Sequence, residues 1–181
     1  MSQVIVAKRY ADALFQLAEE NNLTDQFIEE LNVVKSVFEQ NEKLSVLLAS
    51  PNATISEKTA LIDTAFASVH LHIKNGLKIM VERRRSNVIL QMVEEFVNLY
   101  NDKNDIAYAV VSSVRELSPV ELTNVETTFK KLLNKKSLII DNKVDESLLG
   151  GLRIRVGNTI YDGSLSNKLK RIEQNLLTAN K

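Results

Sequence analysis

A glycine-rich stretch, GGLRIRVGNTIYDG at residues 150–163, is the first candidate for a chemical site in this sequence. It holds four of the five glycines of the 181-residue chain, at Gly150, Gly151, Gly157 and Gly163. A phosphate-binding loop needs glycines whose N–H groups converge, followed directly by a helix and usually by Lys-Ser or Lys-Thr. Here a strand-like alternation follows, and neither G-x-x-x-x-G-K-[ST] nor G-x-G-x-x-G is present. We therefore predict structural turns, with Gly157-Asn158 at the tip of a β-hairpin.

Metal and acid–base chemistry have few candidate residues. His70 and His72 are the only histidines, and there is no cysteine. Side chains two apart on a helix point about 200° apart, so these histidines cannot bind one metal ion from a shared face. Paired carboxylates such as Glu19-Glu20 fall on outward helix faces. We expect no metal, no cofactor and no catalytic site. The alternative that stays open is a small nucleotide-binding enzyme that uses residues 150–163.

Charge also limits the possible functions. The basic run ERRRSN at residues 82–87 could bind phosphate, but we interpret it as a solvated helix end, where each cation stabilises the helix dipole by ~0.3–1 kcal/mol. The net charge is zero: residues 1–104 carry 11 Lys/Arg and 14 Asp/Glu, and residues 105–181 carry 12 and 9. Neither half is basic enough for nucleic-acid binding. No apolar run reaches the ~20 residues that span a membrane.

The first 104 residues read as successive helices, since apolar residues recur every three or four positions. Only two prolines and five glycines interrupt the chain. The first two apolar faces consist of Val4, Ala7, Ala11, Leu14 and Ala18, then Phe27, Leu31, Val34 and Phe38. Thr54 and Glu57 have the spacing of a capping box. The sequence predicts a six-helix bundle that ends at the polar segment YNDKNDI, residues 100–106.

Residues 105–181 follow a different pattern. IAYAVVSSV at residues 106–114 and SLIIDNKV at residues 137–144 read as strands. The helix between them begins at Ser118, with Glu121 at capping-box spacing. After the hairpin, a last helix carries Leu165, Leu169, Ile172 and Leu176 on one side, and we expect most of them to pack inward. The fold class is α+β: a six-helix bundle followed by a small α/β domain with a β-hairpin.

Over its whole length the chain resembles the delta-subunit family of the rotary ATP synthase, which includes the mitochondrial oligomycin-sensitivity-conferring protein. The N-terminal segment VAKRYADALFQLA resembles the first helix of that family. The C-terminal signature is matched by Leu138, Ile140, Val144, Asp145, Leu148, Gly150, Gly151, Leu152, Ile154, Arg155 and Gly157, followed by DGSLSNKLKRI.

The resemblance implies a non-catalytic stator subunit. Residues 1–104 would hold the N-terminal helices of the alpha subunits, and residues 105–181 would join the b subunits of the peripheral stalk. The link would let rotor torque drive ATP synthesis coupled to proton transport. The protein would then be peripheral, on the cytoplasmic face of a bacterial membrane, with no small-molecule substrate and no bound nucleic acid.

The resemblance also points to a groove between the first and fifth helices for a helix of the alpha subunits. The expected lining residues are Tyr10, Ala13, Leu14, Asn75, Lys78 and Ile79, although Leu14 and Ile79 would equally suit the bundle core. On the last helix, Lys168 and Arg171 would steer an acidic stalk partner, and Leu176 would contact it.

Overall fold

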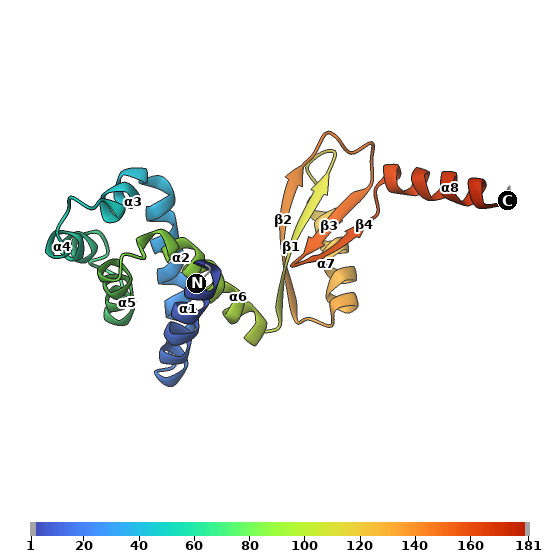
Figure 1. Ribbon diagram of the computed structural model, residues 1–181. Helices are drawn as coiled ribbons and strands as arrows, with labels where there is room; N and C mark the ends of the chain where they lie inside the picture. Colours follow the sequence, from blue (N-terminus) through green and yellow to red (C-terminus); the bar gives the residue numbers. More distant parts are fainter. Residues whose placement is uncertain (1–2, 180–181) are drawn as a thin grey trace. The chain divides into compact units, whose positions relative to one another are not determined.

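The chain is α+β, as expected from the sequence, and folds as two compact units, Met1–Tyr100 and Asn101–Lys181 (Figure 1). The computed structural model describes residues 3–179, with side chains as far as residue 174. The units divide between Tyr100 and Asn101. This point lies within a helix and before the end of residues 1–104, the range expected for the first domain.

The first unit is helical. Its elements are α1 (Gln3–Glu20), α2 (Thr24–Gln40), α3 (Glu42–Ala49), α4 (Ile55–Ala65), α5 (Leu71–Glu82), the 3-10 helix η1 (Ser86–Val88) and α6 (Ile89–Lys103). Helix α6 continues to Lys103, so the first four residues of the expected break at residues 100–106 are helical. Apolar periodicity reports which side of a helix is buried, so a polar last turn hides a helix that continues.

One hydrophobic core joins the helices of the first unit. Phe27 and Phe96 are fully buried, and Phe15 meets Phe96 edge to face with ring centroids 5.3 Å apart. Each buried phenylalanine contributes roughly 1.5–3 kcal/mol. The apolar faces predicted for α1 and α2 point into this core, with one exception. Val4 is 54% exposed, because it lies in the first turn of α1, where the core has ended.

The two predicted capping boxes are both confirmed. At α4, the Glu57 N–H donates to Thr54 Oγ1 at 3.3 Å, and the Thr54 N–H donates to Glu57 Oε2 at 2.8 Å. Ser118 and Glu121 make the same pair of bonds before the helix that follows β1. Each cap is worth about 1 kcal/mol, and together they fix where these helices begin.

Helix α5 ends in a Schellman motif that holds Arg84 in the left-handed region. The Arg85 N–H donates to the Met80 carbonyl at 2.8 Å, and the Arg84 N–H donates to the Val81 carbonyl at 2.9 Å. Arg84 has a φ of 56°. Glycine is the usual residue here, and a side chain costs about 1–2 kcal/mol in this conformation. An arginine therefore stands where glycine would be more stable.

The second unit is a small α/β structure. Its elements are β1 (Ile106–Ser113), α7 (Pro119–Leu133), β2 (Ser137–Val144), β3 (Leu152–Val156), β4 (Thr159–Asp162) and α8 (Leu165–Ala179). The sheet order is β2-β1-β3-β4, in which β1 runs parallel to β2 and antiparallel to β3. Strands β3 and β4 form the predicted hairpin, with Val156 opposite Thr159.

The two faces of the sheet differ. Helix α7 covers one face of the sheet (Figure 1). Phe129 of α7 packs against the buried cluster that includes Ala109 and Val111 of β1. On the other face, Tyr108, Ile139 and Ile160 are between 47% and 59% exposed. Since successive residues of a strand point to opposite faces, the unit buries one side of its sheet and leaves apolar groups on the other.

Candidate partner-binding surfaces

The backbone geometry gives the glycines of residues 150–163 structural roles. Gly150, Gly151 and Gly157 have φ values of 148°, 80° and 55°. A Cβ on Gly151 would lie 2.5 Å from the carbonyl oxygen of Gly163, so a side chain does not fit there. A Cβ on Gly157 would meet no atom within 4 Å, so this glycine is needed only for the conformation of the hairpin turn.

The start of α8, which a phosphate loop would leave free, is capped by its own chain. The Leu165 N–H donates to the Gly150 carbonyl at 2.9 Å, and the Asn167 N–H donates to Ser164 Oγ at 3.3 Å. The Ser164 N–H donates to Asp162 Oδ1 at 2.9 Å. These N–H groups already have acceptors, which does not favour the nucleotide-binding alternative.

A cation beside two of these glycines is also engaged. Arg115 lines a cavity of about 440 Å³ beside Gly150 and Gly151. Its guanidinium donates to both carboxylate oxygens of Glu121, at 2.8 and 3.0 Å. This pair, together with the bonds from Ser118, lowers the pKa of Glu121 to about 2. Arg115 therefore neutralises a carboxylate that caps α7.

The histidines lie at the start of a helix. His70 is the N-cap of α5, and its Nδ1 accepts from the His72 N–H at 3.3 Å. The His70 N–H itself donates to Glu30 Oε2 at 2.6 Å. Within the described residues, no group of three or more metal-binding side chains is found.

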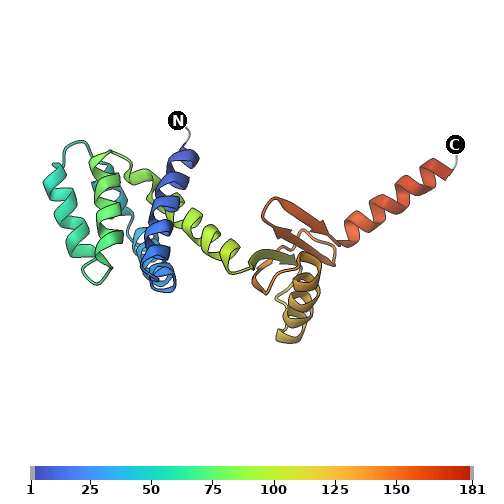
Figure 2. The ribbon, with the colours of Figure 1, turned by 90° about the horizontal axis from the view of Figure 1, so that it is seen from below.

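The surface expected between α1 and α5 rests on a close approach of the two helices, which lie side by side in Figure 2. A Cβ on Gly76 would lie 3.3 Å from Leu14 Cδ2, so the helices meet where α5 has no side chain. Leu14 is 5% exposed. It therefore forms the contact between the helices and belongs to the core.

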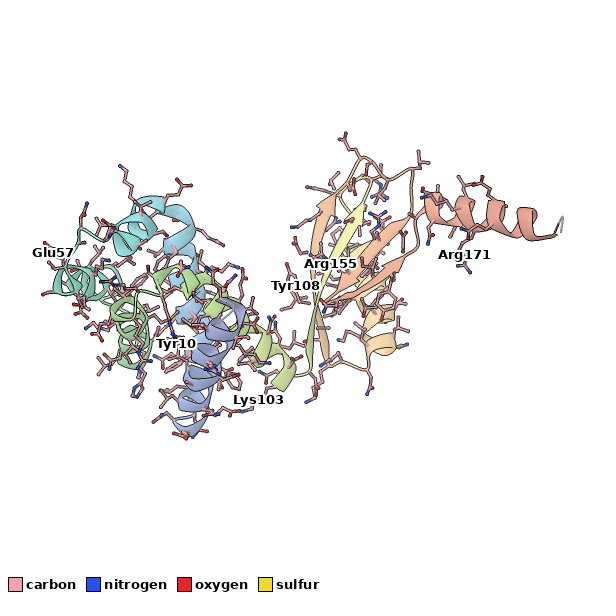
Figure 3. All side chains as sticks on the ribbon, in the orientation of Figure 1. Tyr10, Glu57, Lys103, Tyr108, Arg155 and Arg171 are labelled. Carbon is pink, nitrogen blue, oxygen red and sulfur yellow. The ribbon has the colours of Figure 1, made fainter. Side chains whose placement is uncertain are left out.

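The other predicted residues of α1 surround this contact. Ala13 is exposed, and Tyr10 is half-buried one turn before Leu14. The Tyr10 side chain, labelled in Figure 3, carries the Arg85 guanidinium over its ring, 5.9 Å from the centroid. Arg85 Nη1 also donates to the Tyr10 hydroxyl at 3.5 Å. The sequence had suggested that Arg85 is a solvated cation. In the structure it also packs on Tyr10.

On α5, the three predicted residues have different surroundings. Asn75 is exposed, and Ile79 is 43% exposed one turn after Gly76. Lys78 instead pairs with Asp63 of α4, with Nζ 2.6 Å from Oδ1. The structure thus brings Ile79 next to the α1 contact and turns Lys78 toward α4.

One exposed residue of this surface was missed in the sequence. Leu17 is 37% exposed and lies one turn after Leu14. Tyr10, Ala13 and Leu17 have the spacing of one helix side, which would have indicated it. The α1–α5 surface is defined here as Tyr10, Ala13, Leu17, Asn75 and Ile79.

A second candidate surface lies on α8. Leu165, Leu169 and Ile172 are 46%, 59% and 55% exposed, so the expectation that most of this side packs inward is wrong for all three. Amphipathic spacing shows that a helix has an apolar side but not what covers it. Lys168 and Arg171 are exposed on the same helix, where Figure 3 labels Arg171. The side chain of Leu176 lies outside the described residues.

Known proteins match this chain along almost its whole length. The family model for the ATP synthase delta (OSCP) subunit matches residues 6–176. ATP synthase subunit delta of Oceanobacillus iheyensis is 44% identical over 181 residues, 100% of both chains. The corresponding protein of Bacillus cytotoxicus is 44% identical over 177 residues, 98% of each chain.

A solved structure has the same fold. A chain of the Toxoplasma gondii mitochondrial ATP synthase hexamer superposes with a TM-score of 0.78 at 17% identity, covering 94% of this chain and 97% of that one. The fold and the sequence matches lead to one conclusion: the chain belongs to the ATP synthase delta (OSCP) subunit family, a structural and not a catalytic part of the synthase.

Proposed function

We propose that this chain, as the non-catalytic stator subunit of an F-type ATP synthase, binds the alpha subunits through its first unit and the b subunits through its second. The observation that carries this proposal is the presence of a separate partly apolar surface on each unit, the α1–α5 surface and the exposed side of α8. An adaptor between two partners needs two such surfaces and no reactive group.

The α1–α5 surface suits an amphipathic helix. Leu17 and Ile79 offer apolar contact, Ala13 leaves room for close approach, and Tyr10 adds a ring already held by Arg85. A helix that lies along such a surface places apolar residues at three- and four-residue spacing against it. The N-terminal helix of an alpha subunit is the partner that the family membership suggests.

The exposed side of α8 suits a second helix. Leu165, Leu169 and Ile172 form a continuous apolar stripe, and exposed apolar stripes of this kind mark interaction sites. Lys168 and Arg171 add positive charge beside the stripe. Exposed charges raise the association rate more than the affinity, so they would guide an acidic segment of the b subunits toward the stripe.

Attachment at two points explains how a protein without chemistry of its own takes part in ATP synthesis. The head must not rotate with the rotor, so the stator has to remain bound during each turn. A dissociation constant of 1 nM corresponds to about −12.3 kcal/mol, which one modest surface rarely provides alone.

No helix among the described residues is long and apolar enough to cross a membrane. We place the chain at the cytoplasmic face of a bacterial membrane, as a peripheral part of the complex.

The proposal is tested by calorimetry with the full chain and a peptide that copies the N-terminus of an alpha subunit. Leu17→Glu should weaken binding more than tenfold, because it buries a charge under the partner helix. The matched control is Val33→Glu, which places the same charge on the exposed side of α2, where Val33 is 52% exposed. Equal affinities for the two variants would contradict the assignment of the α1–α5 surface.

A further inference from the structure

A cavity in the first unit lies where α3, α4 and the end of α5 meet, and the α1–α5 surface does not use it. Its volume is about 580 Å³. The lining combines polar and apolar residues, with Leu48, Ile55 and Val81 among the apolar ones. Two cationic side chains, Lys58 and Arg84, also line it, and no Asp or Glu does.

Lys58 is unusual because a lysine is rarely buried. The residue is 8% exposed. Its Nζ donates to the Ser50 carbonyl at the end of α3, at 2.6 Å. One neutral acceptor leaves two of the three ammonium N–H donors for other groups. A buried ammonium normally has an anionic partner, and within the described residues no carboxylate is paired with Lys58.

Arg84 supplies an independent observation. It occupies the left-handed position of the Schellman motif with a φ of 56°, where glycine is the usual residue. Backbone strain of this kind is found where a side chain has a task that offsets its cost. Arg84 lines the same cavity as Lys58.

We propose that this cavity binds a carboxylate carried on an apolar chain. The carboxylate would accept hydrogen bonds from Lys58 and Arg84, and the apolar part would contact Leu48, Ile55 and Val81. This site is independent of the α1–α5 surface and of α8, so it goes beyond the proposed stator contacts. An acidic side chain of a neighbouring polypeptide and a free carboxylic acid share this chemistry.

The test titrates sodium hexanoate into the full chain and follows backbone amide shifts of residues that line the cavity. Hexanoate should bind saturably, and acetate and inorganic phosphate should bind at least about tenfold more weakly, because neither has an apolar tail. Lys58→Met should weaken hexanoate binding at least about tenfold. Lys43→Met, which removes a charge from the exposed surface of α3, should leave it unchanged.

A second variant tests the proposal even if Lys58→Met does not fold. Arg84→Gly relaxes the left-handed residue, so its melting temperature should equal or exceed that of the natural chain, while its hexanoate affinity falls several-fold. The proposal is overturned if hexanoate causes no saturable shift, if phosphate binds equally well, or if Arg84→Gly and Lys43→Met bind hexanoate alike.

A further arm separates the two sources of the carboxylate. Synthase stripped of this protein is reconstituted with the natural chain or with Lys58→Met. If an acidic side chain of the synthase occupies the cavity, Lys58→Met and excess hexanoate should each weaken attachment. If a free carboxylic acid is the ligand, attachment should be the same for both chains.

Discussion

The two units of the chain use their apolar side chains in different ways. In the first unit, each helix from α1 to α6 buries at least one residue in a shared core. In the second unit, α7 has no fully buried residue, and the three leucine and isoleucine side chains described on α8 are about half exposed. The first unit therefore draws its stability from its own packing. The second leaves the apolar side of α8 exposed, and a partner that binds there would add stability.

Truncation of a core side chain in the first unit should have the largest effect. Phe96→Ala should lower the free energy of unfolding of that unit by about 3–5 kcal/mol, because it opens a cavity beside Phe15. Phe129→Ala in α7 should cost less, since Phe129 is only half-buried. Urea unfolding followed by amide signals of each unit measures both. A smaller loss for Phe96→Ala than for Phe129→Ala would contradict this difference between the two units.

A side chain at Gly151 should destabilise the second unit alone. Gly151→Val combines a φ of 80° with a Cβ 2.5 Å from the Gly163 carbonyl oxygen. The strain and overlap should cost about 2–5 kcal/mol. Gly157→Ala is the matched control, because it has a φ of 55° but no neighbouring atom within 4 Å, and it should cost only about 1–2 kcal/mol. Hydrogen exchange of β1 and α1 amides would report the two units separately, and faster exchange in α1 would count against their independence.

Acid should weaken the second unit through Glu121. Hydrogen bonds from Arg115 and Ser118 lower its pKa from 4.5 to about 2. The ionised carboxylate therefore stabilises the folded state above pH 4.5, and this contribution is lost as the pH falls from 4.5 toward 2. Glu121→Gln should make the free energy of unfolding depend less on pH between pH 4.5 and pH 2. Glu146→Gln, at an exposed position, should leave the profile as it is in the natural chain.

Changes on the exposed side of α8 should have the smallest effect on stability. Leu169→Ser should alter the free energy of unfolding by no more than about 0.5 kcal/mol, because Leu169 is 59% exposed. The same change should weaken binding to a peptide from the C-terminal end of the b subunits more than tenfold. Thermal melts and calorimetry measure the two quantities. A large loss of stability with unchanged binding would show that this side of α8 packs within the unit.

The sequence predicted local structure better than surfaces. The capping boxes at Thr54 and Ser118 and the hairpin at Gly157 were predictable, because their hydrogen bonds join residues a few positions apart. The exposure of Leu169 was not, because amphipathic spacing is the same for a side that meets the core and a side that meets a partner. The cavity beside Lys58 was not predictable either, since it brings together two stretches that are separate in the sequence, residues 48–58 and 81–87.

The contact between Gly76 and Leu14 has a consequence for partner selection. Helices α1 and α5 approach closely at a residue without a side chain, since a Cβ at Gly76 would lie 3.3 Å from Leu14 Cδ2. Gly76→Ala would require the Leu14 side chain to shift by a few tenths of an ångström, without altering any exposed side chain. A helix bound at the proposed α1–α5 surface would therefore depend on a buried contact that it does not itself touch.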